Sequence, residues 1–188
     1  KGLIENRDSF FVSDYIRDIL GKSIPLAILS GPNIAKEIAE EHPAATTISA
    51  QDSDTSRYFQ TLVSNHYFRA YTAKDMRGVE LGGIIKNVLA IAAGALDGCA
   101  FGTNAKSAMM ARGLQEMIRI GTFFGAQPTT FYGLSGLGDL ITTCSSKDSR
   151  NWNTGYALSQ GKFSLNNTTS THISEGVKTA RLLYQLAQ

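Results

Sequence analysis

The pattern of apolar and polar residues predicts alternating helices and strands over the first 75 residues. Apolar residues at helical spacing predict a helix over 9–20, with Asp8 or Ser9 as its N-cap. Short apolar runs that end at turn residues predict buried strands. In chain order we then expect a strand over 24–31, a helix over 33–43, a strand over 44–50, a helix over 53–65 and a strand over 68–75. Such alternation is typical of a parallel sheet with crossover helices, here with elements for only half a domain.

The strand pattern stops at about residue 75, and helical patterns follow. We expect long helices over 77–97 and 103–125, then a loop over the Gly-rich stretch YGLSGLGDL at 132–140, and a last helix over 174–188. In the second of these helices Arg112 and Glu116 lie one turn apart, and Gly125 and Pro128 provide a stop. The pattern therefore predicts an α/β unit over 1–75 joined to an all-helical unit over 76–188.

Composition changes this picture little. Of the 188 residues, 43% are hydrophobic and 18% charged, which suits a packed core, and the net charge of +2 without a basic run argues against nucleic acid or an anionic membrane as partner. Cys99 and Cys144 have no CxxC spacing, so two free thiols in a reducing compartment are expected. No apolar run approaches the roughly 20 residues of a membrane helix. The three histidines are isolated, and we expect no metal site.

Lys86 is the first candidate for chemistry. It lies in GVELGGIIKNVLAIAAG, residues 78–94, a segment of almost entirely small and apolar residues. Its helical neighbours one turn away, such as Gly82 and Ala90, cannot pair with its charge. One interpretation is a lysine whose amine reaches solvent along a packed stem. The other is a lysine in a dry cleft, where desolvation lowers its pKa toward the range useful for proton transfer.

A second constellation is GDLITTCSSKDSRN at residues 138–151. Asp139 follows a pair of nearby glycines, and Ser149, Arg150 and Asn151 cluster just before an expected helix. A guanidinium, neutral donors and a helix N-terminus together suit a phosphate or carboxylate. An ordinary capping box on a solvated turn remains the alternative.

Three further motifs are weaker. The GKS at 21–23 lacks the P-loop glycine, since position 16 is Ile16, and GLSGLG lacks the order of a dinucleotide fingerprint. The SGPN at 30–33 ends an expected strand, where ligand sites of α/β proteins are common, but it also suits a plain turn.

With LSGPNIAKE, LGGIIKN, GLGDLITTC and SRN in this order, the chain resembles the bacterial NAD(P)-dependent glycerol-3-phosphate dehydrogenases over essentially its whole length. The resemblance implies the end of a Rossmann-like nucleotide-binding domain over 1–75. It implies over 76–188 an all-helical substrate domain similar to the C-terminal domain of 6-phosphogluconate dehydrogenase. It also implies interconversion of dihydroxyacetone phosphate and glycerol 3-phosphate, which supplies phospholipid synthesis, in a cytoplasmic homodimer.

The resemblance assigns a catalytic role to Lys86 as proton donor and acceptor. Asn87 and Asp139 would hold the substrate and orient the lysine, and Thr143 would add a polar contact. Asp139 is therefore the second residue expected in catalysis.

The same resemblance implies that the substrate phosphate is held by Ser149, Arg150 and Asn151. Gly31 and Asn33 would line the substrate. Position 33 departs from the family pattern, which has Ser or Thr there.

The cofactor expected from the resemblance is NAD or NADP. Lys1 would reach both substrate and cofactor, and Ala35, Arg150, Ile173 and Glu175 would contact the cofactor. The family's Gly-rich loop lies ahead of Lys1 and is absent from this chain. We therefore expect the chain alone to bind dinucleotide poorly and to be catalytically silent.

Two other functions stay open. The β-hydroxyacid dehydrogenases share the two-domain plan but usually have an asparagine four residues after the lysine, where this chain has Ala90 and places Asn87 next to Lys86. The other alternative is a non-catalytic helical binding or dimerisation module in which Lys86 only reaches solvent.

Overall fold

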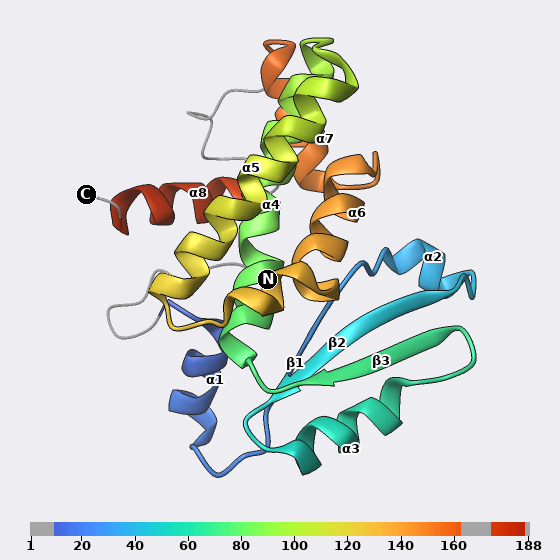
Figure 1. Ribbon diagram of the computed structural model, residues 1–188, viewed down its shortest axis with the longest axis vertical. Coiled ribbons are helices and arrows are strands. Elements are labelled where there is room, and N and C mark those ends of the chain that lie inside the picture. The colour runs from blue at the N-terminus through green and yellow to red at the C-terminus, as the bar shows by residue number, and fades with distance from the viewer. Residues whose placement is uncertain (1–9, 163–173, 187–188) are drawn as a thin grey trace.

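A small sheet and a group of helices share one central helix in the computed structural model, which describes residues 10–162 and 174–186. The sheet with α2 and α3 forms one end, and α5, α6 and α7 stand beside α4 at the other (Figure 1). The elements are α1 (Val12–Leu20), β1 (Ala27–Ser30), α2 (Ala35–Ala39), β2 (Ala44–Ala50), α3 (Ser53–Val63), β3 (Phe68–Ala73), α4 (Met76–Gly98), α5 (Gly102–Phe123), η1 (Pro128–Tyr132), η2 (Leu134–Gly138), α6 (Asp139–Ser145), α7 (Arg150–Ser159) and α8 (Glu175–Leu186).

The sheet has the order β1-β2-β3 and is mixed. β2 and β3 are parallel, with Ala44 opposite Phe68, as the helix α3 between them predicts. β1 and β2 are antiparallel, with Ala27 opposite Ala50, so the expectation of a purely parallel sheet was wrong at this pair. The reason is the length of α2. A parallel pair would need a helix that leads the chain back along the whole of the neighbouring strand, about 23 Å for the seven residues of β2. The five residues of α2 rise only about 7.5 Å.

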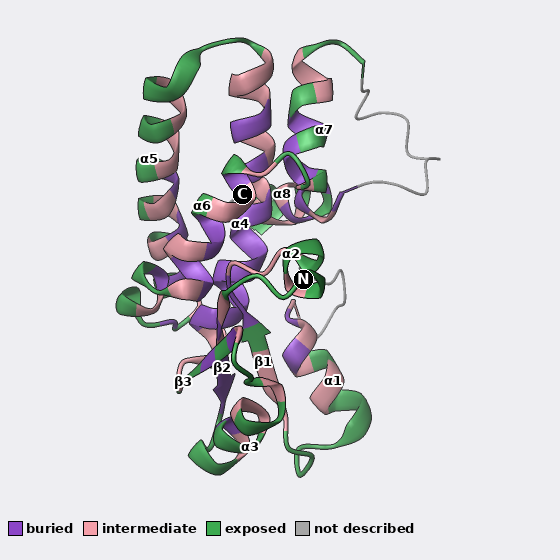
Figure 2. Cartoon of the chain, turned by 90° about the vertical axis from the view of Figure 1, so that its right-hand side faces the viewer, coloured by how far each residue is buried: buried purple, intermediate pink, exposed green. Residues whose placement is uncertain are grey.

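Helix α4 is the core of the molecule, and most of its residues are buried (Figure 2). Its length confirms the helix expected over 77–97. Of the residues that the structure describes, α4 is the one helix long and apolar enough to cross a membrane, which the sequence interpretation did not expect. Its most apolar window has a mean hydropathy of 1.6, and 61% of that window is buried inside the protein, as in the core helix of a globular domain.

Glycines let α7 approach α4 more closely than side chains would allow. A Cβ on Gly94 would collide with the backbone of Trp152, and a Cβ on Gly155 would collide with the backbone of Ile91. These two helices make the most extensive helix–helix contact in the described parts of the chain. The first turn of α7 is thereby fixed beside the middle of α4.

The Gly-rich stretch at 132–140 is helical, so the expected loop was wrong. It forms a π-helical turn, η2, that runs directly into α6. Gly82 of α4 and Gly136 of η2 leave room for this turn, because a Cβ at either position would collide with a neighbouring backbone. Asp75 holds the preceding turn η1: it caps α4 at the Gly78 N–H (2.9 Å) and accepts from the Thr130 hydroxyl (2.6 Å).

The N-cap expected for the first helix is wrong. Helix α1 begins at Val12 with Phe11 as its N-cap, whereas Asp8 and Ser9 lie outside the described residues. In α5, Glu116 pairs with Arg119 at 3.1 Å, three residues on. The expected stop at the end of α5 is confirmed, since Gly125 has a positive φ of 82°.

Candidate active site

Lys86 of α4 and Asp139 of α6 form a buried ion pair. The Lys86 Nζ donates a hydrogen bond to Asp139 Oδ1, although 53 residues separate the two in sequence. Lys86 is 8% exposed and Asp139 1%. Of the two interpretations left open by the sequence, the lysine whose amine reaches solvent is wrong, and the lysine held in a buried environment fits the structure. The lowered pKa stays a prediction, because burial and a carboxylate partner act on an amine in opposite directions.

Asp139 is positioned at the start of α6. Thr143, one turn later, donates from Oγ1 to the Asp139 carbonyl at 2.6 Å and lies 3.3 Å from Oδ1. A Cβ on Gly138 would stand 3.7 Å from the Pro32 ring, so the turn after β1 packs against this end of α6. Segments from the sheet, α4 and α6 thus meet at the ion pair.

The turn at 30–33, which packs against the start of α6 through Pro32, contains two residues that were predicted to line the substrate. Gly31 is buried, and a Cβ there would lie 3.0 Å from the Thr46 Cα, so a side chain at this position would press on β2. Asn33 donates from Nδ2 to the Ala45 carbonyl at 3.0 Å. Its Oδ1 is buried and has no hydrogen-bond partner among the described residues. An acceptor left in this way is suited to a donor on a ligand.

The predicted anion grip forms the first turn of α7. Ser149 is the N-cap and accepts from the Trp152 N–H at 3.2 Å, so its ordinary capping role is confirmed. Asn151 is buried, and its Oδ1 accepts from the Gly176 N–H of α8 at 2.9 Å. A Cβ on Gly176 would lie 2.5 Å from the Asn87 carbonyl, so Asn87 and Asn151 flank the start of α8.

Arg150 points to the surface and pairs with Glu175 at 2.8 Å. Its side chain is 78% exposed. The ion pair thus joins two residues that the family resemblance places at the cofactor. Asn87, in contrast, is 4% exposed and donates to the Gly83 carbonyl within its own helix at 3.4 Å.

The remaining predicted residues are not placed in this cluster. Ala35 is exposed as the first residue of α2. Lys1 and Ile173 lie outside the described residues. Their roles stay predictions.

Glu80 is a buried charged residue near the site that the sequence interpretation missed. Its carboxylate accepts from the Ser13 N–H (3.1 Å) and hydroxyl (2.5 Å), and so caps α1, whose own N-cap has no side-chain hydrogen bond. The signal was available: an acid at position 80 between the apolar residues Val79 and Leu81.

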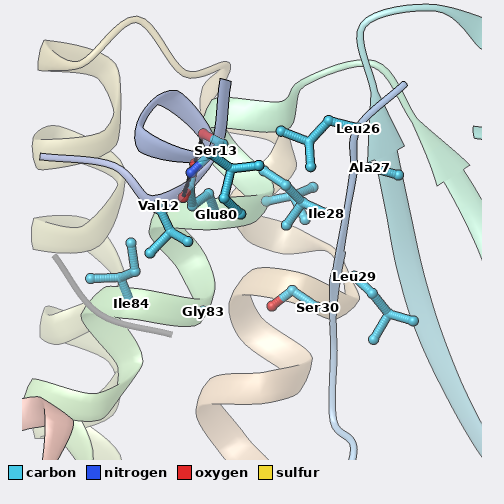
Figure 3. A pocket seen from close by; sticks show the side chains of 12 residues that line it. Val12, Ser13, Leu26, Ala27, Ile28, Leu29, Ser30, Glu80, Gly83 and Ile84 are labelled. Carbon is cyan, nitrogen blue, oxygen red and sulfur yellow. Dashed lines mark hydrogen bonds between the residues drawn. The ribbon is translucent and has the colours of Figure 1, made fainter. Parts of the chain in front are cut away.

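Glu80 also lines a cavity of about 190 Å³ between α1, β1 and α4. Figure 3 shows Ser13 and Glu80 close together at one wall and Ser30 at another. The Ser30 hydroxyl is buried without a hydrogen-bond partner among the described residues. Gly83 and Ile84, which precede Lys86 on α4, also line the cavity.

This arrangement suits proton transfer and anion binding. The buried amine and carboxylate can hold and move a proton, and Arg150 with the α7 N-terminus can hold an anion. In the described parts of the chain, no cluster of three or more His, Cys, Asp or Glu side chains could hold a metal ion.

Comparison with known proteins gives a consistent result. The family model of the NAD-dependent glycerol-3-phosphate dehydrogenase C-terminus matches residues 75–188, and the model of its N-terminus matches residues 1–56. The glycerol-3-phosphate dehydrogenase [NAD(P)+] of Gloeobacter violaceus is 50% identical over 167 residues, which cover 87% of this chain and 54% of the relative. That of Geobacillus kaustophilus is 44% identical over 181 residues, covering 94% and 52%.

A solved structure agrees with these matches. The crystal structure of glycerol-3-phosphate dehydrogenase from Coxiella burnetii has a TM-score of 0.90 and 38% identity, over 100% of this chain and 57% of that one. The chain spans about half the length of the curated relatives it matches. The fold and the family models agree, and the chain belongs to the NAD-dependent glycerol-3-phosphate dehydrogenase family.

Proposed function

We propose that this chain forms the substrate-binding and catalytic half of an NAD(P)-dependent glycerol-3-phosphate dehydrogenase, which interconverts dihydroxyacetone phosphate and sn-glycerol 3-phosphate. The observation that carries the proposal is the ion pair between Lys86 and Asp139, buried where α4, α6 and the 30–33 turn meet. Family membership supports the choice of reaction.

Lys86 is the proton donor in the direction of reduction. As the carbonyl carbon of dihydroxyacetone phosphate gains a hydride, the Lys86 ammonium gives a proton to the carbonyl oxygen, which becomes the hydroxyl of glycerol 3-phosphate. Oxidation reverses both transfers, and the neutral amine takes the proton back. Asp139 orients the ammonium through its hydrogen bond, and Thr143 holds the carboxylate. Arg150 and the first turn of α7 bind the substrate phosphate.

The residues present fit one end of a nicotinamide dinucleotide. NAD(P)H, when bound, supplies the hydride. The unpartnered Oδ1 of Asn33 can accept from an amide or hydroxyl of a ligand, and Arg150 and Glu175 present an exposed donor and acceptor at the start of α8. Ala35 stands at the start of α2 after Asn33. We therefore assign Ala35, Arg150 and Glu175 to the cofactor side of the site, with Lys1 and Ile173 carried over from the resemblance, and keep Asn33 with Gly31 on the substrate side.

The test uses a chimera in which this chain replaces the matching part of the Gloeobacter violaceus relative. We expect oxidation of NADH or NADPH with dihydroxyacetone phosphate and little with unphosphorylated dihydroxyacetone, because the Arg150 region binds the phosphate. Comparing the two cofactors measures the preference. Absence of turnover with either substrate contradicts the proposal, and turnover with a panel of β-hydroxyacids would favour the alternative dehydrogenase family.

Lys86→Ala in the same chimera separates catalysis from a helical binding module. A general acid–base residue is worth roughly 100-fold or more in kcat, whereas a module in which Lys86 has no chemical role predicts nearly normal turnover. Lys106→Met, which removes a lysine of α5 outside the site, is the matched control.

The rest of the proposal concerns the chain as a whole. We place the boundary between units at 75/76, supported by Asp75 as the N-cap of α4, which begins at Met76, and propose a cytoplasmic homodimer that supplies glycerol 3-phosphate to phospholipid synthesis. We also propose that the 188-residue chain alone is silent. NADH turnover by the homogeneous chain, without the chimeric partner, would contradict that.

A further inference from the structure

Three helices are joined by one carboxylate at the end of α4 far from Lys86. Asp97 Oδ2 accepts from the Trp152 indole Nε1 of α7 at 2.8 Å and from Lys106 Nζ of α5 at 2.6 Å. The Trp152 side chain is nearly buried and stacks on Tyr156, with ring centroids 5.1 Å apart. Neither Asp97 nor Trp152 belongs to the proposed site.

Glycines set the spacing of α4 and α7, whereas side-chain hydrogen bonds to α4, from Trp152 in the first turn of α7 and from Gln160 at its end, oppose rotation of α7. Gly94 and Gly155 let the two backbones touch, but a glycine presents no side chain that would interlock with the facing helix. The indole N–H of Trp152, in contrast, projects from α7 to a fixed acceptor on α4. A hydrogen bond of this kind resists rotation of α7 about its own axis.

The first turn of α7 is the part that such a rotation would move. Trp152 is capped through its own backbone N–H by Ser149, and Arg150 and Asn151 stand between them in sequence. Successive residues of a helix are turned by 100°, so Arg150 and Trp152 point in different directions from α7. A small rotation of this turn about the axis of α7 would displace the end of the long Arg150 side chain by more than it would displace the buried Trp152 ring. The position of the guanidinium relative to Lys86 therefore depends on how Trp152 is held.

We propose that Trp152 and Asp97 are positioning residues for the phosphate site, setting the angle at which Arg150 and the α7 N-terminus meet the substrate phosphate. The inference rests on the proposed function and adds to it two residues that do not touch substrate. Their contribution belongs to substrate binding rather than to proton transfer, because the Lys86–Asp139 pair lies on α4 and α6.

The test is Trp152→Phe in the chimera described above, which keeps an aromatic ring and removes the N–H. We expect KM for dihydroxyacetone phosphate to rise about three- to tenfold, the factor that one ordinary hydrogen bond is worth, with kcat within about twofold. Turnover of unphosphorylated dihydroxyacetone, however slow, should not change, since it has no phosphate to place. Asp97→Ala should reproduce the effect.

Two variants separate positioning from stability. Lys106→Met removes the ion pair but keeps the indole hydrogen bond, and Asp97→Asn keeps an acceptor for the indole, so both should lower the unfolding temperature while KM stays within about twofold. Equal effects of Trp152→Phe on both substrates, or a KM change in Lys106→Met as large as in Trp152→Phe, would overturn the inference. An inactive unaltered chimera contradicts the proposed function and this inference with it. An active one with unchanged KM in Trp152→Phe and Asp97→Ala contradicts the inference alone.

Discussion

At the scale of single residues, burial decides what Lys86 and Asp139 cost and what they can do. Removing both charges from water is expensive, and their mutual attraction offsets this only while both are present. The exposed pair of Glu116 and Arg119 differs, since water screens it and such pairs contribute at most about 1 kcal/mol. Burial acts on the other titratable group nearby as well: desolvation raises the pKa of the Cys144 thiol to about 12, which leaves it unreactive at neutral pH.

Breaking the buried pair should be costly to stability. We expect Asp139→Ala to lower the free energy of unfolding by about 3–5 kcal/mol, because it leaves the Lys86 ammonium buried without its carboxylate. Urea denaturation followed by circular dichroism measures the loss.

The control for this prediction is Glu116→Ala, which breaks an exposed ion pair and should cost less than about 1 kcal/mol. The double variant Lys86→Met with Asp139→Leu should recover part of the loss, since it leaves no isolated charge. Equal costs for Asp139→Ala and Glu116→Ala would show that the pair is not buried in solution.

At the scale of the elements, small residues rather than large ones determine how α4 meets its neighbours. Gly94 and Gly155 bring α7 into backbone contact, and Gly82 does the same for η2. A glycine inside a helix costs about 1 kcal/mol relative to alanine. That cost is offset here by close packing, which places Asn151 and the α8 start beside Asn87.

Alanine at these contacts should therefore destabilise the protein, although it favours the isolated helix. We expect Gly94→Ala and Gly155→Ala each to lower the free energy of unfolding by about 1–3 kcal/mol, the usual cost of overpacking. Gly138→Ala is the matched control, because its Cβ would lie at an ordinary 3.7 Å from Pro32, and its stability should stay the same or rise. If Gly94→Ala proves as stable as Gly138→Ala in thermal denaturation, the close approach of the two helices is wrong.

At the scale of the whole molecule, α4 makes one cooperative unit of the two parts of the chain. Its first turns hold α1 through Glu80 and Ser13 and pack on β1, and its last turn holds α5 and α7 through Asp97. Loss of either contact should therefore affect the stability of the molecule and not only of one helix.

The pH dependence of stability should report on Asp97. Burial acts to raise the pKa of this carboxyl, but hydrogen bonds from Lys106 and Trp152 outweigh it and hold the pKa below its ordinary value of 3.8. A lowered folded-state pKa stabilises the protein at pH values above the unfolded-state pKa, and this contribution is lost as pH falls through the folded-state pKa.

We accordingly expect the stability difference between the unaltered chain and Asp97→Asn to be largest above about pH 5 and to shrink as pH falls below about 4. Urea denaturation between pH 6 and pH 3 measures the difference. A difference that is constant over this range would mean that Asp97 does not carry the charge in these hydrogen bonds.

The sequence by itself determined the local structure and much of the chemistry. Apolar spacing located the strands and long helices, because periodicity depends only on neighbours along the chain. The same local information identified Lys86 as a charge in a buried segment and Ser149–Asn151 as a helix start suited to an anion. The loop expected at 132–140 was wrong, because a glycine that permits close packing and a glycine that permits a turn cannot be distinguished in sequence.

Only the tertiary structure decided which distant groups meet. Lys86 and Asp139 lie 53 residues apart and meet because α6 packs on α4; no spacing rule along the chain predicts this pair, which was expected only from the family resemblance. The antiparallel direction of β1, the capping of α1 by Glu80 and the junction of three helices at Asp97 likewise follow from packing. The physical reason is common to all: a partner for a buried polar group is chosen by the three-dimensional position of the groups that lose water together, and not by their order in the chain.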